Sequence, residues 1–169
     1  MEVVADGESR LYDQVPPGGL FATYLDGEFR YCLKGQLRGD EGPDHPGVVL
    51  VPGHDDYDGR PGICSESHFD DTTVVYLPSA RLVLRAARDA LAPMNAERKA
   101  GDVIWRPNPH NPAAAHMHIV VADHKRLVCV HLRDGHIEML APSRQATVYR
   151  SWSIVIPSPP GPVELTRYP

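Results

Sequence analysis

Histidine and carboxylate side chains are concentrated in the last third of the chain. His116, Met117 and His118 place two imidazoles one residue apart, and His131 and Glu138 follow shortly after. Imidazole nitrogens and carboxylate oxygens bind zinc, iron or manganese, and a site needs three or more of them converging from a rigid scaffold. The residue types therefore indicate a divalent metal site with His116, His118, His131 and Glu138 as candidate ligands.

Three successive segments around these residues have the pattern of antiparallel strands, at 116–122, 127–132 and 136–141. The turn between the first two segments pairs His118 with His131. Asp134-Gly135 is typical of a two-residue hairpin turn in which both central residues take positive φ, which pairs His131 with Glu138. We therefore expect His118, His131 and Glu138 to form one row across the sheet.

The alternation of side chains between the two faces of each strand supports this register. One face collects only apolar residues, namely Met117, Ile119, Val121, Val128, Val130, Leu132, Ile137 and Met139. The opposite face, called the histidine face below, receives His116, His118, Cys129, His131, Arg133, His136 and Glu138. A slip of one residue in the first hairpin would pair apolar with polar positions, so the pattern itself favours this register.

Sheet geometry limits which of these side chains can share an ion. Alternate residues of one strand, such as His116 and His118, are about 6.6 Å apart, and neighbouring strands are about 4.8 Å apart, so His118 and His131 can share a metal. Glu138 lies about 9.6 Å from His118, two strands away, and reaches the same ion only by leaning inward. Two histidines with one carboxylate suit a non-haem iron or a catalytic zinc with an open position for substrate.

Two other interpretations of the histidine face stay open at this point. Histidines and a glutamate also make ordinary cross-strand pairs on a solvated sheet face. Cys129 precedes His131 by two residues on the same face, so a thiolate–imidazole pair is conceivable, although most cysteines are inert buried residues. Cys32, Cys64 and Cys129 are an odd number without CxxC spacing, which indicates reduced thiols and no disulfide framework.

The composition is that of an ordinary globular chain and disfavours several classes of protein. With 169 residues, 42% of them hydrophobic and 23% charged, the chain is long enough to bury a core. The net charge is -5 and the basic residues are scattered, so we expect no nucleic-acid partner. The N-terminus has no basic region leading into an apolar stretch, and no apolar run approaches membrane length, so we expect a cytoplasmic protein without a membrane partner.

The rest of the sequence predicts a mainly β fold, an antiparallel barrel or two-sheet sandwich of about nine strands. Asp26-Gly27 predicts a hairpin that pairs Tyr24 with Phe29. The inner face of this hairpin is expected to hold Leu20, Ala22, Tyr24, Phe29, Tyr31 and Leu33. Further strands are predicted where β-branched and aromatic residues are frequent, at 48–51, 73–77, 103–105 and 147–156.

One helix is predicted near 80–92, capped by Ser79 and ended by Pro93, although residues 82–84 fit a strand as well. We expect a single domain over 1–156, with halves 1–78 and 101–156 joined by this helix. The loop at 52–71 has no clear element, and its length is typical of a lid or binding loop. Residues 157–169 begin with a proline-rich run and are expected to form an extended tail.

Two local patterns resemble known families. His116-Met117-His118 followed by an acid resembles the metal-binding strand of the cupins, which are β-barrels, but His110 stands where that pattern has glycine and the acid, Asp123, falls in a turn. Residues 101–105 together with 118–121 resemble a short part of the SH3-like barrel of toxin endoribonucleases of the PemK and MazF type. Each resemblance covers too little of the chain to assign a family.

These observations lead to two hypotheses of function. The first is a small-molecule-binding protein, or a metal-dependent enzyme, whose histidine face holds zinc, iron or manganese through His116, His118, His131 and Glu138, with Glu138 as ligand or general base. The second is a non-catalytic interaction module whose strand edges and proline-rich tail bind a partner or a second copy, giving a homo-oligomer.

Overall fold

The computed structural model describes residues 7–39, 42–85, 91–92, 96–106, 116–140, 146–159 and 161–169. Within these ranges the chain forms sixteen strands and three short 3-10 helices. They are β1 (Glu8–Leu11), η1 (Tyr12–Gln14), β2 (Leu20–Leu25), β3 (Glu28–Lys34), β4 (Leu37–Gly39), β5 (Gly42–Asp44), β6 (Gly47–His54), η2 (Asp55–Tyr57), β7 (Arg60–Cys64), η3 (Glu66–His68), β8 (Thr73–Tyr76), β9 (Arg81–Leu84), β10 (Val103–Arg106), β11 (His116–Asp123), β12 (Arg126–His131), β13 (Ile137–Met139), β14 (Thr147–Tyr149), β15 (Trp152–Ile156) and β16 (Val163–Tyr168). None of the helices in these ranges is long and apolar enough to span a bilayer.

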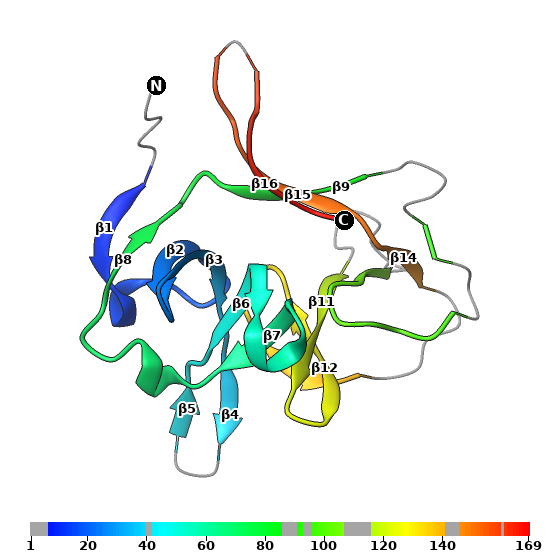
Figure 1. The fold of residues 1–169 in the computed structure, drawn as a ribbon, viewed down its shortest axis with the longest axis horizontal. Helices are drawn as coiled ribbons and strands as arrows, with labels where there is room; N and C mark the ends of the chain where they lie inside the picture. The colour runs from blue at the N-terminus through cyan, green and yellow to red at the C-terminus, as the bar shows by residue number, and fades with distance from the viewer. Residues whose placement is uncertain are drawn as a thin grey trace.

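Eleven of the strands form one large sheet. Its neighbours run in the order β1-β8-β2-β3-β6-β7-β11-β10-β14, and β12 and β13 continue from β11. A second sheet has the order β16-β15-β9, and β4 and β5 form a separate two-stranded ribbon. Figure 1 shows the second sheet along the upper side of the molecule and the β4–β5 ribbon projecting from the lower side.

The predicted mainly β class is confirmed, and of the two predicted architectures the described residues form two packed sheets and no closed barrel. Among the described residues the path of paired strands runs from β1 to β14 without returning to its start. Two strands share one edge of β11, because β10 pairs with residues 116–119 and β7 pairs in parallel with Ala122, while β12 takes the other edge. The end strands β1 and β14 each pair with one neighbouring strand of the sheet, so the path stays open among the described residues.

The helix predicted near 80–92 is wrong where the structure describes this segment, because residues 81–84 form β9. Leu82 and Leu84 are half-buried while Arg81 and Val83 are exposed, which is the period of a strand. Leu82 lies opposite Ile154 of β15. A short apolar run fits both a helix and a strand, and the neighbouring strand decides between them. Residues 86–90 of the predicted helix lie outside the described residues.

Two other element predictions are wrong because the deciding contacts are distant in sequence. The predicted strand at 147–156 is two strands of different sheets, β14 and β15, separated by Arg150 and Ser151. The predicted loop at 52–71 contains β7, which lies between β6 and β11 inside the large sheet. Pro61 and Gly62 disfavour a strand prediction, yet Gly62 is required here because a Cβ atom would collide with the ring of Tyr57.

The hairpin predicted at Asp26-Gly27 is confirmed. Both residues take positive φ, 53° and 83°, and Tyr24 lies opposite Phe29. The predicted inner face is wrong at its outer end, because 73% of the Tyr24 surface and 42% of the Phe29 surface are exposed. At the other end of this hairpin Ala22 is buried and packs with Ile156 of the second sheet.

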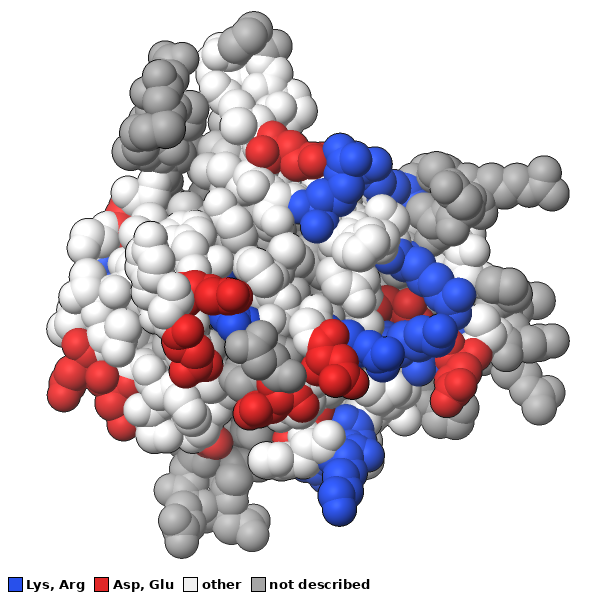
Figure 2. Space-filling view, in the orientation of Figure 1, with Lys and Arg blue, Asp and Glu red and all other residues white. Residues whose placement is uncertain are grey.

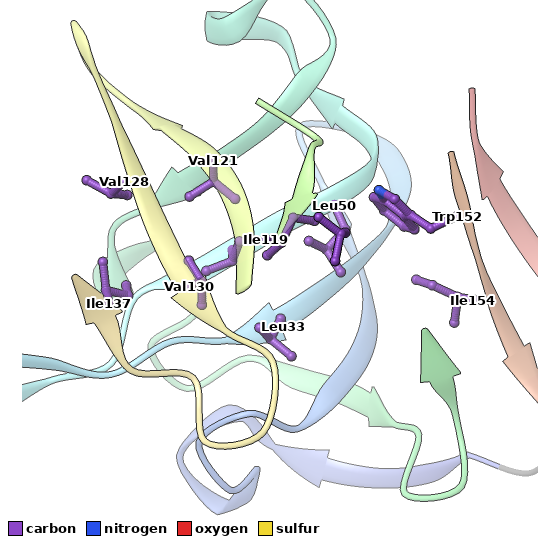
Figure 3. Close-up of a cluster of buried hydrophobic side chains, with 11 residues drawn as sticks. Leu33, Leu50, Ile119, Val121, Val128, Val130, Ile137, Trp152 and Ile154 are labelled. Carbon is purple, nitrogen blue, oxygen red and sulfur yellow. The ribbon is translucent and has the colours of Figure 1, made fainter. Parts of the chain in front are cut away.

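The main core lies between the two sheets. Trp152 and Ile154 of β15 face Leu50, Ile119 and Val130 of the large sheet (Figure 3). All five residues are fully buried. Burial of side chains of this size removes a large apolar area from water, at about 25 cal/mol per Å², so this contact holds the second sheet on the first.

The C-terminal segment completes the core, so the predicted extended tail is wrong for residues 163–168. These residues form β16, which pairs with β15. The ring of Tyr168 stacks on that of Trp152 with 5.1 Å between centroids, and its hydroxyl donates to the carbonyl of Ala100 over 3.0 Å. The indole Nε1 of Trp152 donates to the carbonyl of Gly101 over 2.8 Å. Gly101, at φ 96°, also leaves the space that the Tyr168 ring occupies.

The Trp152 hydrogen bond yields a stability prediction. In Trp152→Phe the ring is smaller and the buried carbonyl of Gly101 loses its donor, which we expect to lower the free energy of unfolding by about 1–3 kcal/mol. Equilibrium unfolding in urea measures this loss. Trp105→Phe is the matched control, because Trp105 is half-buried and its replacement should cost less. Equal losses in the two variants would contradict the role given to Trp152.

Candidate functional site

The histidine face is built on β11, which lies between β10 and β12. His118 pairs with Ile104 of β10 on one side and with His131 of β12 on the other. The predicted pairing of His118 with His131 is therefore confirmed. The turn that sets this register has two central residues, His124 and Lys125, and His124 takes positive φ, 52°.

The predicted register of the second hairpin is wrong by two residues. Glu138 lies opposite Cys129 instead of opposite His131. Only Gly135 of the Asp134-Gly135 pair takes positive φ, 71°, so the turn is not the two-residue type that this dipeptide favours. The longer turn is held by the segment that follows β3, because the backbone N–H of Gln36 donates to the carbonyl of Gly135 over 2.8 Å.

This shift changes which residues meet on the histidine face. A shift of two residues keeps every side chain on its own face, so Glu138 remains on the histidine face. Its backbone now lies diagonal to His118, because Cys129 is opposite Val120, yet its Oε1 atom lies 3.3 Å from the Nε2 atom of the His118 ring. The Glu138 side chain therefore leans across β12 to reach His118, as the predicted register also required.

His118 is buried, and its environment favours the neutral imidazole. Only 7% of its surface is exposed. Burial lowers its pKa to about 4, the Glu138 carboxylate opposes this shift, and the charges of His131 and Arg106 add to it. Its Nδ1 atom is buried and has no hydrogen-bond partner among the described residues. A buried polar atom of this kind costs free energy unless something pairs with it.

His131 is oriented by the carboxylate of Asp134, a residue that sequence reasoning treated only as part of a turn. The Nδ1 atom of His131 lies 2.7 Å from Oδ1 of Asp134, which also accepts the backbone N–H of His136 over 3.0 Å. Burial raises the pKa of the Asp134 carboxyl, but these hydrogen bonds outweigh burial and lower it overall. An ionised carboxylate only accepts, so Nδ1 of His131 donates to Asp134, which leaves Nε2 as the ring nitrogen for another partner.

His116 completes a triangle of imidazoles and is exposed to solvent. Its ring centroid lies 5.6 Å from that of His131 and 6.5 Å from that of His118, and the latter two are 5.0 Å apart. In the part of the chain that the structure describes, no three or more histidine, cysteine or acidic side chains stand in an arrangement ready to hold a metal ion. His110, a further candidate from the sequence, lies outside the described residues.

Arg106 of β10 is a second residue of the site that sequence reasoning missed. Its Nη1 atom lies 4.0 Å from Oε1 of Glu138. Arg106 pairs with His116 in the β10–β11 register and so belongs to the same face. The alternation of side chains along residues 103–106 places Arg106 on one face of its strand. It assigns Arg106 to the histidine face only when β10 is known to pair with β11.

Cys129 belongs to the histidine face but is part of a packed cluster. It is fully buried among Ile104, Val120 and Val148, the last of these on β14. Burial raises the pKa of its thiol to about 11. The protonated thiol is a poor nucleophile, so the structure disfavours a thiolate–imidazole pair.

The buried His118 predicts a pH dependence of stability in protein treated with a chelator. The pKa of His118 is about 4 in the folded protein, below its ordinary value of 6.5. The contribution of His118 to the free energy of unfolding is therefore complete above pH 6.5 and is lost as the pH falls toward 4, because the unfolded state takes up the proton first. The loss is at most about 3 kcal/mol. Urea unfolding of His118→Gln between pH 7 and pH 4 should show a flatter dependence than the parent protein. His68→Gln, at an exposed position, is the control, and parallel curves for all three proteins would contradict the prediction.

The site therefore joins His116, His118 and His131 with Glu138, and adds Arg106 and Asp134 around them. Comparison of the chain with protein family models, with curated proteins and with solved structures found no match.

Proposed function

We propose that the histidine face binds a small molecule with the help of a divalent metal ion, zinc, iron or manganese. The ion is held by His118 and His131, with His116 and Glu138 as further ligands. One observation carries this proposal: His118 and His131 are direct cross-strand neighbours with ring centroids 5.0 Å apart, and a carboxylate orients one of them.

The spacing of the three rings supports a shared ion. Two imidazoles bound to one tetrahedral zinc through bonds of about 2.1 Å have ring centroids about 5 Å apart. The rings of His118 and His131 have this separation, and that of His116 is 5.6 Å from His131. Since the donor atoms do not yet converge, binding requires rotation of side chains, which the exposure of His116 permits.

The protonation of the ligands supports the same proposal. A metal binds neutral imidazole, and the low pKa of His118 removes competition from protons at neutral pH. In metal sites the second nitrogen of a ligating histidine usually donates to a carboxylate or a carbonyl. Asp134 supplies this partner to His131.

The proposed chemistry follows from the ligand count. An ion held by three histidines keeps one tetrahedral position open for a small molecule. Such an ion polarises a bound carbonyl or phosphoryl group, and Glu138 is close enough to act as a fourth ligand or as a general base. Arg106 beside Glu138 adds a cation that favours an anionic group on the bound molecule.

The test is elemental analysis and calorimetric titration of the untagged protein with zinc, manganese and ferrous salts. We expect near-stoichiometric binding that is absent from the His118→Ala, His131→Ala double variant and retained in His68→Ala, the exposed control. Asp134→Asn should weaken metal affinity about 10- to 100-fold, because it removes the carboxylate that orients His131. Binding that is absent from the parent protein, or unchanged in the double variant, would contradict the proposal.

A second candidate function, self-association, is favoured by one exposed aromatic pair. Tyr24 and Phe29 contact each other edge to face with 5.4 Å between centroids, at 73% and 42% exposure. Aromatic side chains are enriched where protein surfaces meet. The proline-rich tail proposed for this role from the sequence is unsuitable for a deletion test, because Tyr168 belongs to the core.

The second candidate predicts a change of oligomeric state. Tyr24→Ser combined with Phe29→Ser should convert a dimer into a monomer in sedimentation velocity, because it removes the apolar surface that a second copy would cover. Met139→Ser, at another exposed apolar position, should leave the dimer intact. A parent protein that is monomeric at high concentration would exclude this function.

A further inference from the structure

A cavity of about 360 Å³ lies between the two sheets, on the side of β11 opposite the histidine face. Its apolar lining comes from both sheets and from the residues that follow β8 and β12, and includes Leu20, Leu33, Leu77, Leu82, Met117 and Leu132. Small-molecule sites are typically concave, mostly apolar and at least about 300 Å³ in volume. The size and lining of this cavity are those of a ligand site.

Arg81 is the charged residue among the described residues that line the cavity. It begins β9 and its side chain is exposed. No carboxylate or other hydrogen-bonding group pairs with its guanidinium in the part of the chain that the structure describes. The position therefore places an unpaired cation at the edge of an apolar cavity.

Arg60, Lys99, Lys125 and Arg133 are also exposed without a carboxylate partner among the described residues, but none of them lines the cavity. Two other arginines are paired with carboxylates. Arg85, just beyond the same strand, lies 3.3 Å from Glu164, and Arg126 lies 2.7 Å from Asp123. On the face shown in Figure 2, many basic side chains likewise lie next to acidic ones. In a chain of net charge -5, an arginine without a carboxylate partner is available for an anion from outside.

We propose that this cavity binds a small apolar carboxylic acid, with its hydrocarbon body among the leucines and its carboxylate on Arg81. Guanidinium groups bind carboxylates through two parallel hydrogen bonds. A cavity of about 150 Å³ is enough for benzene, so about 360 Å³ accommodates a body of one or two rings or a branched aliphatic chain.

The cavity and the histidine face are separate sites on opposite sides of one strand. Met117 lines the cavity, while His116 and His118, its neighbours along β11, point to the other face. Binding of an acid in the cavity does not depend on metal at the histidine face. The two proposals can therefore fail independently.

The test uses the untagged full chain and three probes in isothermal titration calorimetry: 1-naphthoate, the uncharged 1-naphthalenemethanol, and acetate. We expect saturable 1-naphthoate binding at one site, weaker binding of the alcohol and none of acetate. Arg81→Gln should weaken 1-naphthoate about 10- to 100-fold, the value of a charged hydrogen-bonded contact, and leave the alcohol unchanged. Arg85→Gln, the matched control, should leave both unchanged.

A second variant tests the location of the site. Ala80→Trp places a large side chain at the cavity lining and should abolish binding of both aromatic probes, provided that its circular dichroism spectrum matches that of the parent protein. Binding unchanged in Ala80→Trp would place the probe elsewhere and overturn the proposal. Equal weakening of 1-naphthoate binding in Arg81→Gln and Arg85→Gln would show a general electrostatic effect and overturn the role given to Arg81. Absence of 1-naphthoate binding to the parent protein would overturn the whole proposal.

Discussion

Alternation of side chains along β11, a strand covered on both faces, is the constraint on which the rest of the structure depends. Ile119 and Val121 enter the main core on one face, and His118 is buried on the other. Because successive side chains point to opposite faces, a one-residue change of register would exchange the imidazole with the core residues. Burying an imidazole without a hydrogen-bond partner in the main core is costly, so core packing also positions the histidines.

The second sheet buries the apolar face of β11, and a cavity lies at the edge of this contact. Trp152 and Ile154 fill the space above β11, and Tyr168 closes the stack from β16. Beside these large side chains, the cavity lined by Leu82, Arg81 and Met117 remains open. The same packing that holds the histidine face in place therefore leaves room for a ligand on the opposite face of the strand.

Three Asp-Gly turns among the described residues show how far local sequence predicts this fold. Asp26-Gly27 and Asp58-Gly59 both have positive φ at each residue, as the dipeptide favours. Asp134-Gly135 departs from this conformation because the Asp134 carboxylate binds His131 and the backbone of His136, while Gln36 bonds the following glycine. The departure moves Glu138 by two residues, from opposite His131 to opposite Cys129. The contacts that alter the turn are also contacts of the site.

The sequence by itself determined the mainly β class, the first histidine hairpin and the assignment of His116, His118, His131 and Glu138 to one face. These features depend on side-chain period and on turns of two residues, which are local properties. Only the tertiary structure decided that 81–84 is a strand, that β14 and β15 separate, and that Arg106 and Asp134 join the histidines. In each case the deciding partner is a side chain or strand brought near by packing, and packing between distant segments is not encoded in any short stretch of sequence.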